Sequence, residues 1–131
     1  MRFLLICLGG GAHGAAARYG VGGLAARWWG TEFPYGTLIV NVTGSFLIGF
    51  IQQVGLNTLA FSDTVRLVLT IGVMGGYTTY SSFSYETLRL AEQGSWLSAL
   101  LNVVLTTALC LAVCALGLGL GRIVVGWKGG L

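Results

Sequence analysis

The chain has 131 residues, of which 55% are hydrophobic and only 8% are charged, and its mean hydropathy is +0.82. Soluble domains carry about 25% charged residues, so this chain cannot cover a water-facing surface and is predicted to be an integral membrane protein. The net charge of +3 is small and scattered along the chain, which excludes nucleic acid as a partner because that would require a basic patch.

The apolar stretches predict one transmembrane domain over residues 1–131 with an all-α fold. About 20 residues cross a bilayer as a helix, so four spans fit this length and six do not. We expect the spans at approximately residues 2–26, 36–54, 65–90 and 96–121, in a multi-pass arrangement with both termini on one side. The tryptophans mark the predicted span ends, as interfacial aromatics do: Trp28, Trp29, Trp96 and Trp127.

The basic residues are only weakly biased between the two sides of these spans. Apart from Arg18, four lie on the side of the termini and two, Arg27 and Arg89, lie on the other. A weak bias leaves the orientation poorly specified. An antiparallel dimer and a single orientation with cytoplasmic termini are therefore both open from charge alone.

The 22 glycines include three pairs spaced four residues apart, a spacing that lets helix backbones approach closely in lipid. Four short helices have little room to enclose a pore, so tight packing favours a homodimer. The pairs are Gly10 with Gly14, Gly72 with Gly76, and Gly117 with Gly121.

Arg18 lies toward the far end of the first span. An arginine at such a position can extend its charged head to the interface while its stem stays in the apolar region. The alternative is that Arg18 attracts anions into a vestibule. The first span contains no aspartate or glutamate, and its His13 is the one histidine of the chain, so it has no partner for a metal site.

Polar side chains recur along one broad face of the second span, at spacings of four, four and seven residues: Thr37, Asn41, Ser45 and Gln52. The amide of Asn41 offers two N–H donors. Polar residues inside membranes also clamp one helix to another. The spacing alone leaves both interpretations open.

The run GGYTTYSSFSYE, residues 75–86, is the most informative part of the third span. Glycines followed by β-branched threonines form helix poorly, so the sequence favours a break near the middle of the span. A break would free backbone carbonyls, for which a hard cation such as Na⁺ is a candidate partner. The competing interpretation is a continuous helix whose threonines bond back to the preceding turn.

Beyond this break, Tyr80 and Phe83 lie three residues apart and share a helix face. Their ring edges could help to coordinate a dehydrated anion, although ordinary packing is the commoner use of this spacing. Glu86 is the one acid predicted within a span, which makes it a candidate ion or proton site, or an acceptor that orients hydroxyls. The serines of this run add hydroxyl donors: Ser81, Ser82 and Ser84.

The fourth span carries Asn102, Thr106, Cys110 and Cys114, each four residues apart. This stripe winds slowly around the helix and suits a polar track that faces the second and third spans. Taken alone, the two cysteines favour packing as small hydrophobes. The chain shows no nucleophile–base pair and no set of metal ligands, so we do not expect an enzyme.

Three motifs in order resemble the small fluoride-channel family known as Fluc or CrcB. GGGAHGAAARYG at residues 9–20 is similar to the family's glycine-rich first span. PYGTLIVNVTGSFLIG at residues 34–49 is similar to its second-span motif, and GVMGGYTTYSSFSYE at residues 72–86 to its highly specific third-span signature. The resemblance extends over nearly the whole chain.

The resemblance implies a fluoride-selective channel in the plasma (inner) membrane that lets F⁻ leave passively and protects the cell from fluoride. It also implies an antiparallel, dual-topology homodimer with two pores, surrounded by lipid, and a structural Na⁺ held by the carbonyls of Gly75 and Thr78. Arg18 would be the vestibule arginine. The expected fluoride pore draws on three spans: Thr37, Asn41, Tyr80, Ser81, Phe83, Ser84, Glu86, Asn102, Thr106, Cys110 and Cys114.

The chain departs from the commonest family pattern where Tyr80 replaces a phenylalanine, where Asn102 replaces a tyrosine, and where Cys110 and Cys114 replace hydroxyls. These changes concern throughput more than fold. Three other functions are weighed against the channel. A small multidrug exporter would need a carboxylate in its first span, a cation channel built around Glu86 would carry Na⁺, and a structural protein would transport nothing.

Overall fold

The computed structural model describes residues 1–129, and the side chains of residues 1–127. Over this range the chain is helical apart from short connections and contains no strand, which confirms the all-α expectation. The third span is divided into four elements. In chain order the elements are α1 (Arg2–Trp29), α2 (Tyr35–Asn57), α3 (Asp63–Leu67), η1 (Val68–Met74), α4 (Gly75–Tyr77), α5 (Tyr80–Glu92) and α6 (Trp96–Gly129).

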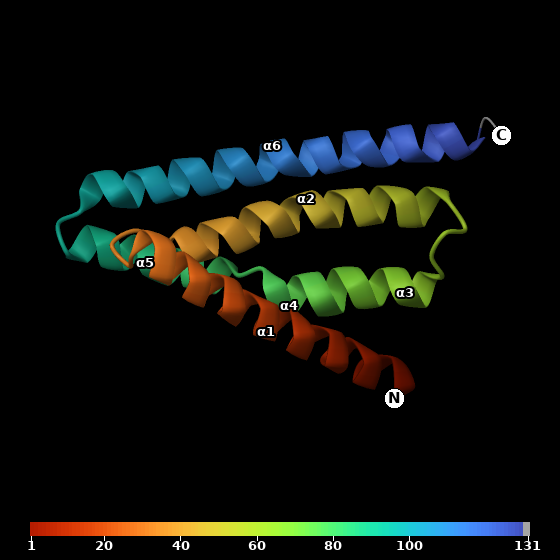
Figure 1. Cartoon of the computed structure of the whole chain (residues 1–131), viewed down its shortest axis with the longest axis horizontal. Coiled ribbons are helices and arrows are strands. Elements are labelled where there is room, and N and C mark those ends of the chain that lie inside the picture. Colours follow the sequence, from red (N-terminus) through yellow and green to blue (C-terminus); the bar gives the residue numbers. More distant parts are fainter. Residues whose placement is uncertain (130–131) are drawn as a thin grey trace.

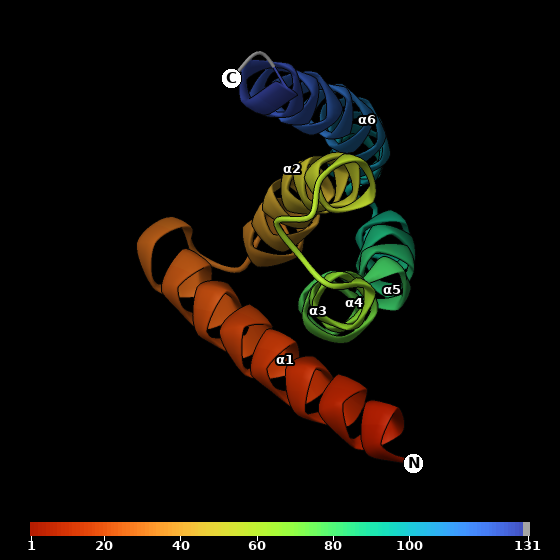
Figure 2. The same cartoon turned by 90° about the vertical axis from the view of Figure 1, so that its right-hand side faces the viewer.

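The helices run back and forth along the long axis of the molecule, with α1 crossing the others obliquely (Figure 1). The α2 helix lies between α6 and the first part of the third span, whereas α5 packs directly against α6. The α1 helix packs on the η1 and α4 side of the third span (Figure 2). The N-terminus and the C-terminal end of α6 lie at the same end of the molecule. This placement agrees with an even number of passes.

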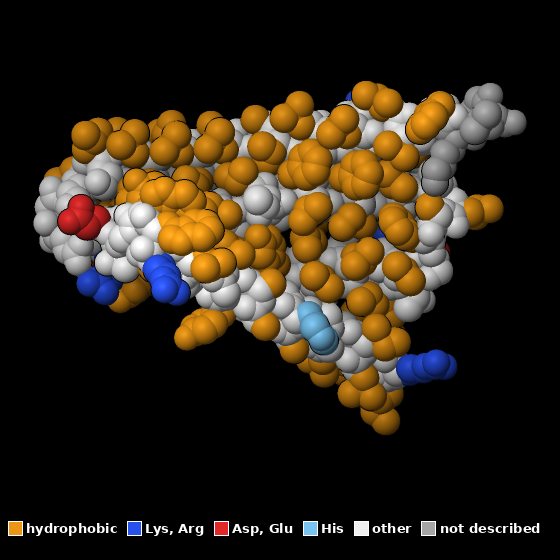
Figure 3. All heavy atoms as spheres, in the orientation of Figure 1, with side chains coloured by type: hydrophobic (Ala, Val, Ile, Leu, Met, Phe, Trp, Pro, Cys, Tyr) orange, Lys and Arg blue, Asp and Glu red, His pale blue; other side chains and the backbone are white. Residues whose placement is uncertain are grey.

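Two of the helices are, by length and composition, apolar enough to cross a membrane: Tyr35–Asn57 and Trp96–Trp127. The α1 helix is longer than the first of these, but its glycines and its arginines lower its hydropathy. The third span falls short because it is broken into shorter helices. Hydrophobic side chains cover most of the face shown in Figure 3, and charged side chains gather toward its two ends.

Glycines fix the closest helix contacts. A Cβ atom built on Gly14 in α1 would overlap the carbonyl oxygen of Val73, and one built on Gly76 would overlap the carbonyl oxygen of Gly11. A Cβ on Gly117 in α6 would overlap the carbonyl oxygen of Phe46 in α2. The backbones therefore touch directly at these points, which confirms the close packing predicted from the glycine spacing.

The π-helix η1 was not predicted from the sequence. Its seven residues, Val68–Met74, pack on α1, as the neighbouring α4 does. The π-helix is rare and often occurs close to functional sites. Here it comes one short helix before the break, so the backbone departs from α-helical geometry twice within one span.

Candidate functional site

The third span is interrupted at Thr78 and Thr79, whose backbones are extended, between the end of α4 at Tyr77 and the start of α5 at Tyr80. The predicted break is confirmed, and the continuous-helix interpretation is wrong. The glycines that motivated the prediction remain helical, so the break begins after them. The Thr78 hydroxyl still donates back to the Met74 carbonyl at 2.9 Å, as the competing interpretation expected for a threonine.

Asn41 of α2 occupies the break and satisfies the backbone of Thr79 on both sides. Its Oδ1 accepts a hydrogen bond from the Thr79 N–H at 2.8 Å, and its Nδ2 donates to the Thr79 carbonyl at 2.9 Å. Asn41 is buried, with 8% of its surface exposed. An amide nitrogen carries two N–H groups, so within the described part of the chain one donor of Asn41 is left for another acceptor. Asn41 is therefore both a clamp and a potential donor.

The same hydrogen bonds leave two carbonyls without their helical partners. In a continuous α-helix the Thr79 N–H would bond to the Gly75 carbonyl, but here it bonds to Asn41. The Ser82 N–H would bond to the Thr78 carbonyl, but here it caps α5 by bonding to the Thr79 hydroxyl at 3.2 Å. The carbonyls predicted to bind Na⁺ are thus among those that the break releases, together with the carbonyls of Gly76 and Tyr77. Gly75 is exposed on the surface of the chain.

An open groove of about 340 Å³ lies beside the break, between α2, α5 and α6. The rings of Tyr80 and Phe83 face each other across 5.5 Å, tilted by 53°. Phe83 is buried, whereas 80% of Tyr80 is exposed. The groove brings together predicted site residues from three spans: Asn41, Tyr80, Phe83, Thr106 and Cys110. It also includes Ser45 and Thr79, which were not among the predicted site residues.

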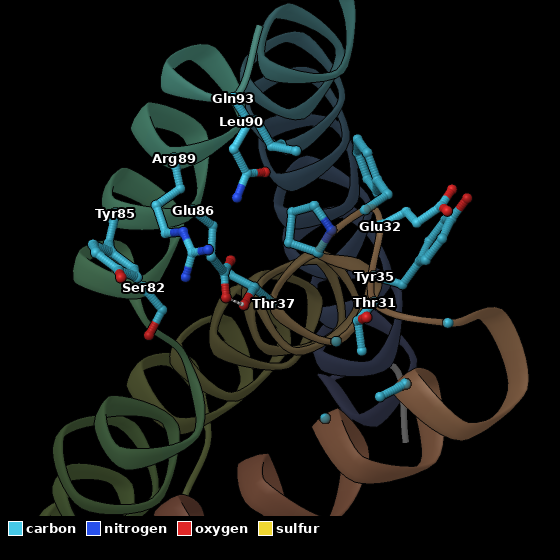
Figure 4. A pocket seen from close by; sticks show the side chains of 16 residues that line it. Thr31, Glu32, Tyr35, Thr37, Ser82, Tyr85, Glu86, Arg89, Leu90 and Gln93 are labelled. Atoms are coloured by element: carbon cyan, nitrogen blue, oxygen red, sulfur yellow. Dashed lines mark hydrogen bonds between the residues drawn. The ribbon is translucent and has the colours of Figure 1, made fainter. Parts of the chain in front are cut away.

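A second cavity, of about 610 Å³, lies between the end of α1, the start of α2 and α5. Here the Thr37 hydroxyl donates to Glu86 Oε1 at 2.9 Å (Figure 4). The other carboxylate oxygen, Oε2, is buried and has no hydrogen-bond partner among the described residues. The predicted residues Thr37 and Glu86 are thus paired, and one lone oxygen of Glu86 is left for a further ligand.

The serines of α5 divide between two faces of the helix. Ser82 lines the second cavity together with Glu86. Ser84 donates back to the Tyr80 carbonyl at 2.9 Å, and Ser81 is exposed; neither lines the groove or the cavity. Their assignment to the pore stays a prediction. Ser82 was absent from the predicted pore, although its spacing of four residues from Glu86 could have indicated it.

Asn102 ties α6 to α5. It is completely buried, its Nδ2 donates to the Thr87 hydroxyl at 2.9 Å, and its Oδ1 accepts from Thr106 at 3.4 Å. Asn102 lines neither the groove nor the cavity. In this chain it acts as a clamp between helices.

The remaining predicted residues lie apart from the groove or at its edge. The thiol of Cys114 packs against Gly49 of α2, where an added Cβ would lie 3.2 Å from the sulfur. Arg18 is half-buried and lines neither hollow. The His13 ring is within 2.7 Å of the Gly9 carbonyl one turn before it. No group of three or more candidate metal-ligating side chains occurs in the described part of the chain.

Known proteins match the chain over most of its length. The family model described as CrcB-like protein, Camphor Resistance (CrcB), matches residues 4–118. A relative from Sorangium cellulosum is 50% identical over 113 residues, which cover 86% of this chain and 89% of the relative. A relative from Roseiflexus sp. is 48% identical and covers 87% and 92%, and one from Geobacter sulfurreducens is 52% identical and covers 77% and 82%. Each relative is named fluoride-specific ion channel FluC.

Proposed function

The chain belongs to the CrcB-like family, and we propose that it is a fluoride-selective ion channel that lets F⁻ leave the cell passively. Its family and its apolar helices make it a membrane protein, and we place it in the plasma (inner) membrane. The observation that carries the proposal is Asn41 in the break of the third span, beside a groove with polar and aromatic walls.

Fluoride must lose water to enter such a groove, so the channel must supply donors. The free N–H of Asn41, the hydroxyls of Ser45 and Thr106, and the positive edge of the Phe83 ring are available there. Fixed donors in a narrow passage favour the smallest halide, which explains how F⁻ is admitted and Cl⁻ refused. The thiol of Cys110 is a weaker donor than a hydroxyl, so we expect it to slow conduction without abolishing it.

The proposed role is protection of the cell from fluoride. Hydrogen fluoride crosses membranes as a neutral weak acid and ionises in a less acidic cytoplasm. A passive path then lets the membrane potential, negative inside, expel the anion. The field supplies ~2.3 kcal/mol per charge per 100 mV, which is a substantial drive without ATP.

We place four membrane passes in each chain, in an antiparallel, dual-topology homodimer surrounded by lipid. The weak bias of the basic residues between the two sides and the location of both termini at one end support this arrangement. Large apolar side chains remain exposed on the single chain, including Leu111 at 69% and Ile71 at 61%, and they would contact lipid or a second copy. We retain residues 1–131 as one transmembrane domain.

A structural Na⁺ at the dimer centre completes the proposal. The carbonyls of Gly75 and Thr78 fit this role, since the break removes their helical donors and a hard cation prefers oxygen ligands. Replacing Na⁺ with N-methyl-D-glucamine is then expected to lower the melting temperature of the purified protein. Binding at 100 times the dissociation constant would contribute about 2.7 kcal/mol. An unchanged melting temperature would contradict the Na⁺ site but would leave the proposed fluoride pathway unaffected.

The function is tested by ion efflux from liposomes that contain the purified protein, loaded in parallel with F⁻, Cl⁻ or Na⁺. A K⁺ ionophore dissipates the voltage in the anion experiments. Rapid loss of F⁻ with retained Cl⁻ and Na⁺ is expected. Loss of Na⁺ alone would indicate a cation channel built around Glu86, and loss of no ion from folded protein would indicate a structural role.

A further inference from the structure

One face of α5 carries a continuous polar stripe that leads away from the break. Ser82, Glu86, Arg89 and Gln93 follow each other at spacings of four, three and four residues, and all four line the second cavity. At 100° per residue these positions fall within an arc of about 60°. The stripe therefore continues past Glu86 to the end of α5, where the cavity opens.

Arg89 is the cation of this stripe. Its guanidinium carbon lies 5.9 Å from the centre of the Tyr85 ring, close enough for a cation–π contact. The arginine side chain extends from α5 beside Glu86, toward the space in front of Thr37 (Figure 4). Within residues 1–127, whose side chains are described, the Arg89 guanidinium forms no ion pair or hydrogen bond. Its donors are therefore free to face an anion.

The carboxylate of Glu86 repels an approaching anion, and the positive charge of Arg89 can offset this repulsion. Fluoride that approaches Thr37 along the cavity meets a carboxylate whose Oε2 has no partner in the described part of the chain. Like charges repel strongly where water is scarce. A guanidinium one helical turn nearer to solvent lowers that repulsion and presents donors before the ion reaches the carboxylate.

We propose that Arg89 is a mouth residue of this channel: it concentrates fluoride at the solvent end of the second cavity and offsets repulsion by Glu86. The inference rests on the fluoride-channel function proposed above. It assigns to α5 a cationic anion-binding position that is distinct from Arg18, which does not line the cavity. Arg89 sets how readily fluoride enters, whereas the groove beside Asn41 selects among anions.

The test compares Arg89→Gln with Arg27→Gln in fluoride efflux from liposomes. Arg27 is exposed in the last turn of α1, at the same end of the molecule, but it does not line the cavity. At fluoride concentrations well below saturation, Arg89→Gln is expected to slow efflux about two- to fivefold, while the rate at saturating fluoride is retained. Arg89→Lys, which keeps the charge, should retain most of the wild-type rate, and Arg27→Gln should match wild type.

Ionic strength provides the second measurement. Raising salt from about 0.01 M to about 1 M shortens the Debye length from ~30 Å to ~3 Å, so the difference between wild type and Arg89→Gln should shrink. The inference is overturned if Arg89→Gln and Arg27→Gln behave alike, or if the loss is equal at all fluoride and salt concentrations. Absence of fluoride efflux from the wild-type protein would instead overturn the proposed channel function itself.

Discussion

The third span has two parts of similar length, one before the break and one after it, and the two parts lie in different surroundings. The half before the break, α3 to α4, packs on α1 through glycines, and its Thr70 hydroxyl donates back to the Arg66 carbonyl within the span. The half after the break, α5, turns polar and charged side chains toward open space. The break thus separates a part that holds the protein together from a part that an ion can reach.

The arginines of the two halves make the same contrast. Arg66, before the break, donates to Gln52 Oε1 at 3.1 Å and pairs with Asp63 at 3.3 Å. Arg89, after the break, contacts the Tyr85 ring and faces the second cavity. An arginine held by an amide and a carboxylate stabilises packing, whereas one with free donors can serve a mobile anion.

Replacing Asn41 should have the largest effect, because this residue joins the two halves. Asn41→Ala leaves the buried Thr79 N–H without a partner, at a cost of about 1–3 kcal/mol, removes one of the hydrogen bonds to the Thr79 carbonyl, and removes a donor from the groove. Fluoride efflux should fall to the background of empty liposomes. Asn57→Ala is the matched control, since Asn57 bonds to a carbonyl of its own helix at an exposed position. Equal efflux from both variants would refute the role of Asn41.

A single methyl group should disrupt the packed half. In Gly14→Ala the new Cβ overlaps the Val73 carbonyl and lies 2.8 Å from the Tyr77 nitrogen, so the unfolding free energy should fall by about 1–3 kcal/mol. Gly23→Ala, in the same helix, meets nothing within 4 Å and should be neutral or stabilising. Thermal unfolding in detergent measures both variants. A stable Gly14→Ala protein would show that α1 does not pack on this half as described.

Removing the hydrogen bond between Thr87 of α5 and Asn102 of α6 should have a smaller effect on stability. Thr87→Val preserves shape but removes the acceptor of the buried Asn102 amide, so we expect a loss of about 1–2 kcal/mol. A double-mutant cycle with Asn102→Leu isolates the contact. The two single changes should be less than additive in the double variant. Strict additivity would mean that the two residues do not interact.

The smallest effect is expected from Tyr80→Phe. The Tyr80 hydroxyl makes no hydrogen bond among the described residues, and the side chain is 80% exposed. Stability should change by less than about 0.5 kcal/mol. Fluoride efflux should change by no more than about threefold, because the Phe83 ring and the Asn41 amide stay in place. A larger change would show that the phenol contacts the ion.

The sequence predicted what depends on local composition. The break followed from glycine and threonine propensities, and the close contacts followed from glycine spacing. Asn41 was identified as an N–H donor and as a possible clamp, and it is placed in the break. These features are read along one helix at a time, so a single sequence suffices for them.

What the sequence did not predict depends on how the helices are turned against each other. No residue pattern distinguishes the π-helix η1 from an ordinary α-helix. The face of α5 that meets the second cavity depends on the residue at which the helix restarts after the break. Ser82 and Arg89, which line the second cavity, were therefore not included among the predicted site residues. Asn102 was expected in the pore because it lies on a polar stripe of the fourth span. Spacing places a residue on such a stripe but does not show what its side chain contacts, which here is the Thr87 hydroxyl.

The most direct test of this account asks whether fluoride passes the α5 half and not the half before the break. In a background with Cys7, Cys110 and Cys114 replaced by alanine or serine, Ser82→Cys and Val73→Cys would each be treated with a charged methanethiosulfonate during fluoride efflux from liposomes. We expect the reagent to block efflux through Ser82→Cys and to leave Val73→Cys conducting. Undiminished efflux from Ser82→Cys that mass spectrometry shows to be fully modified would contradict this expectation.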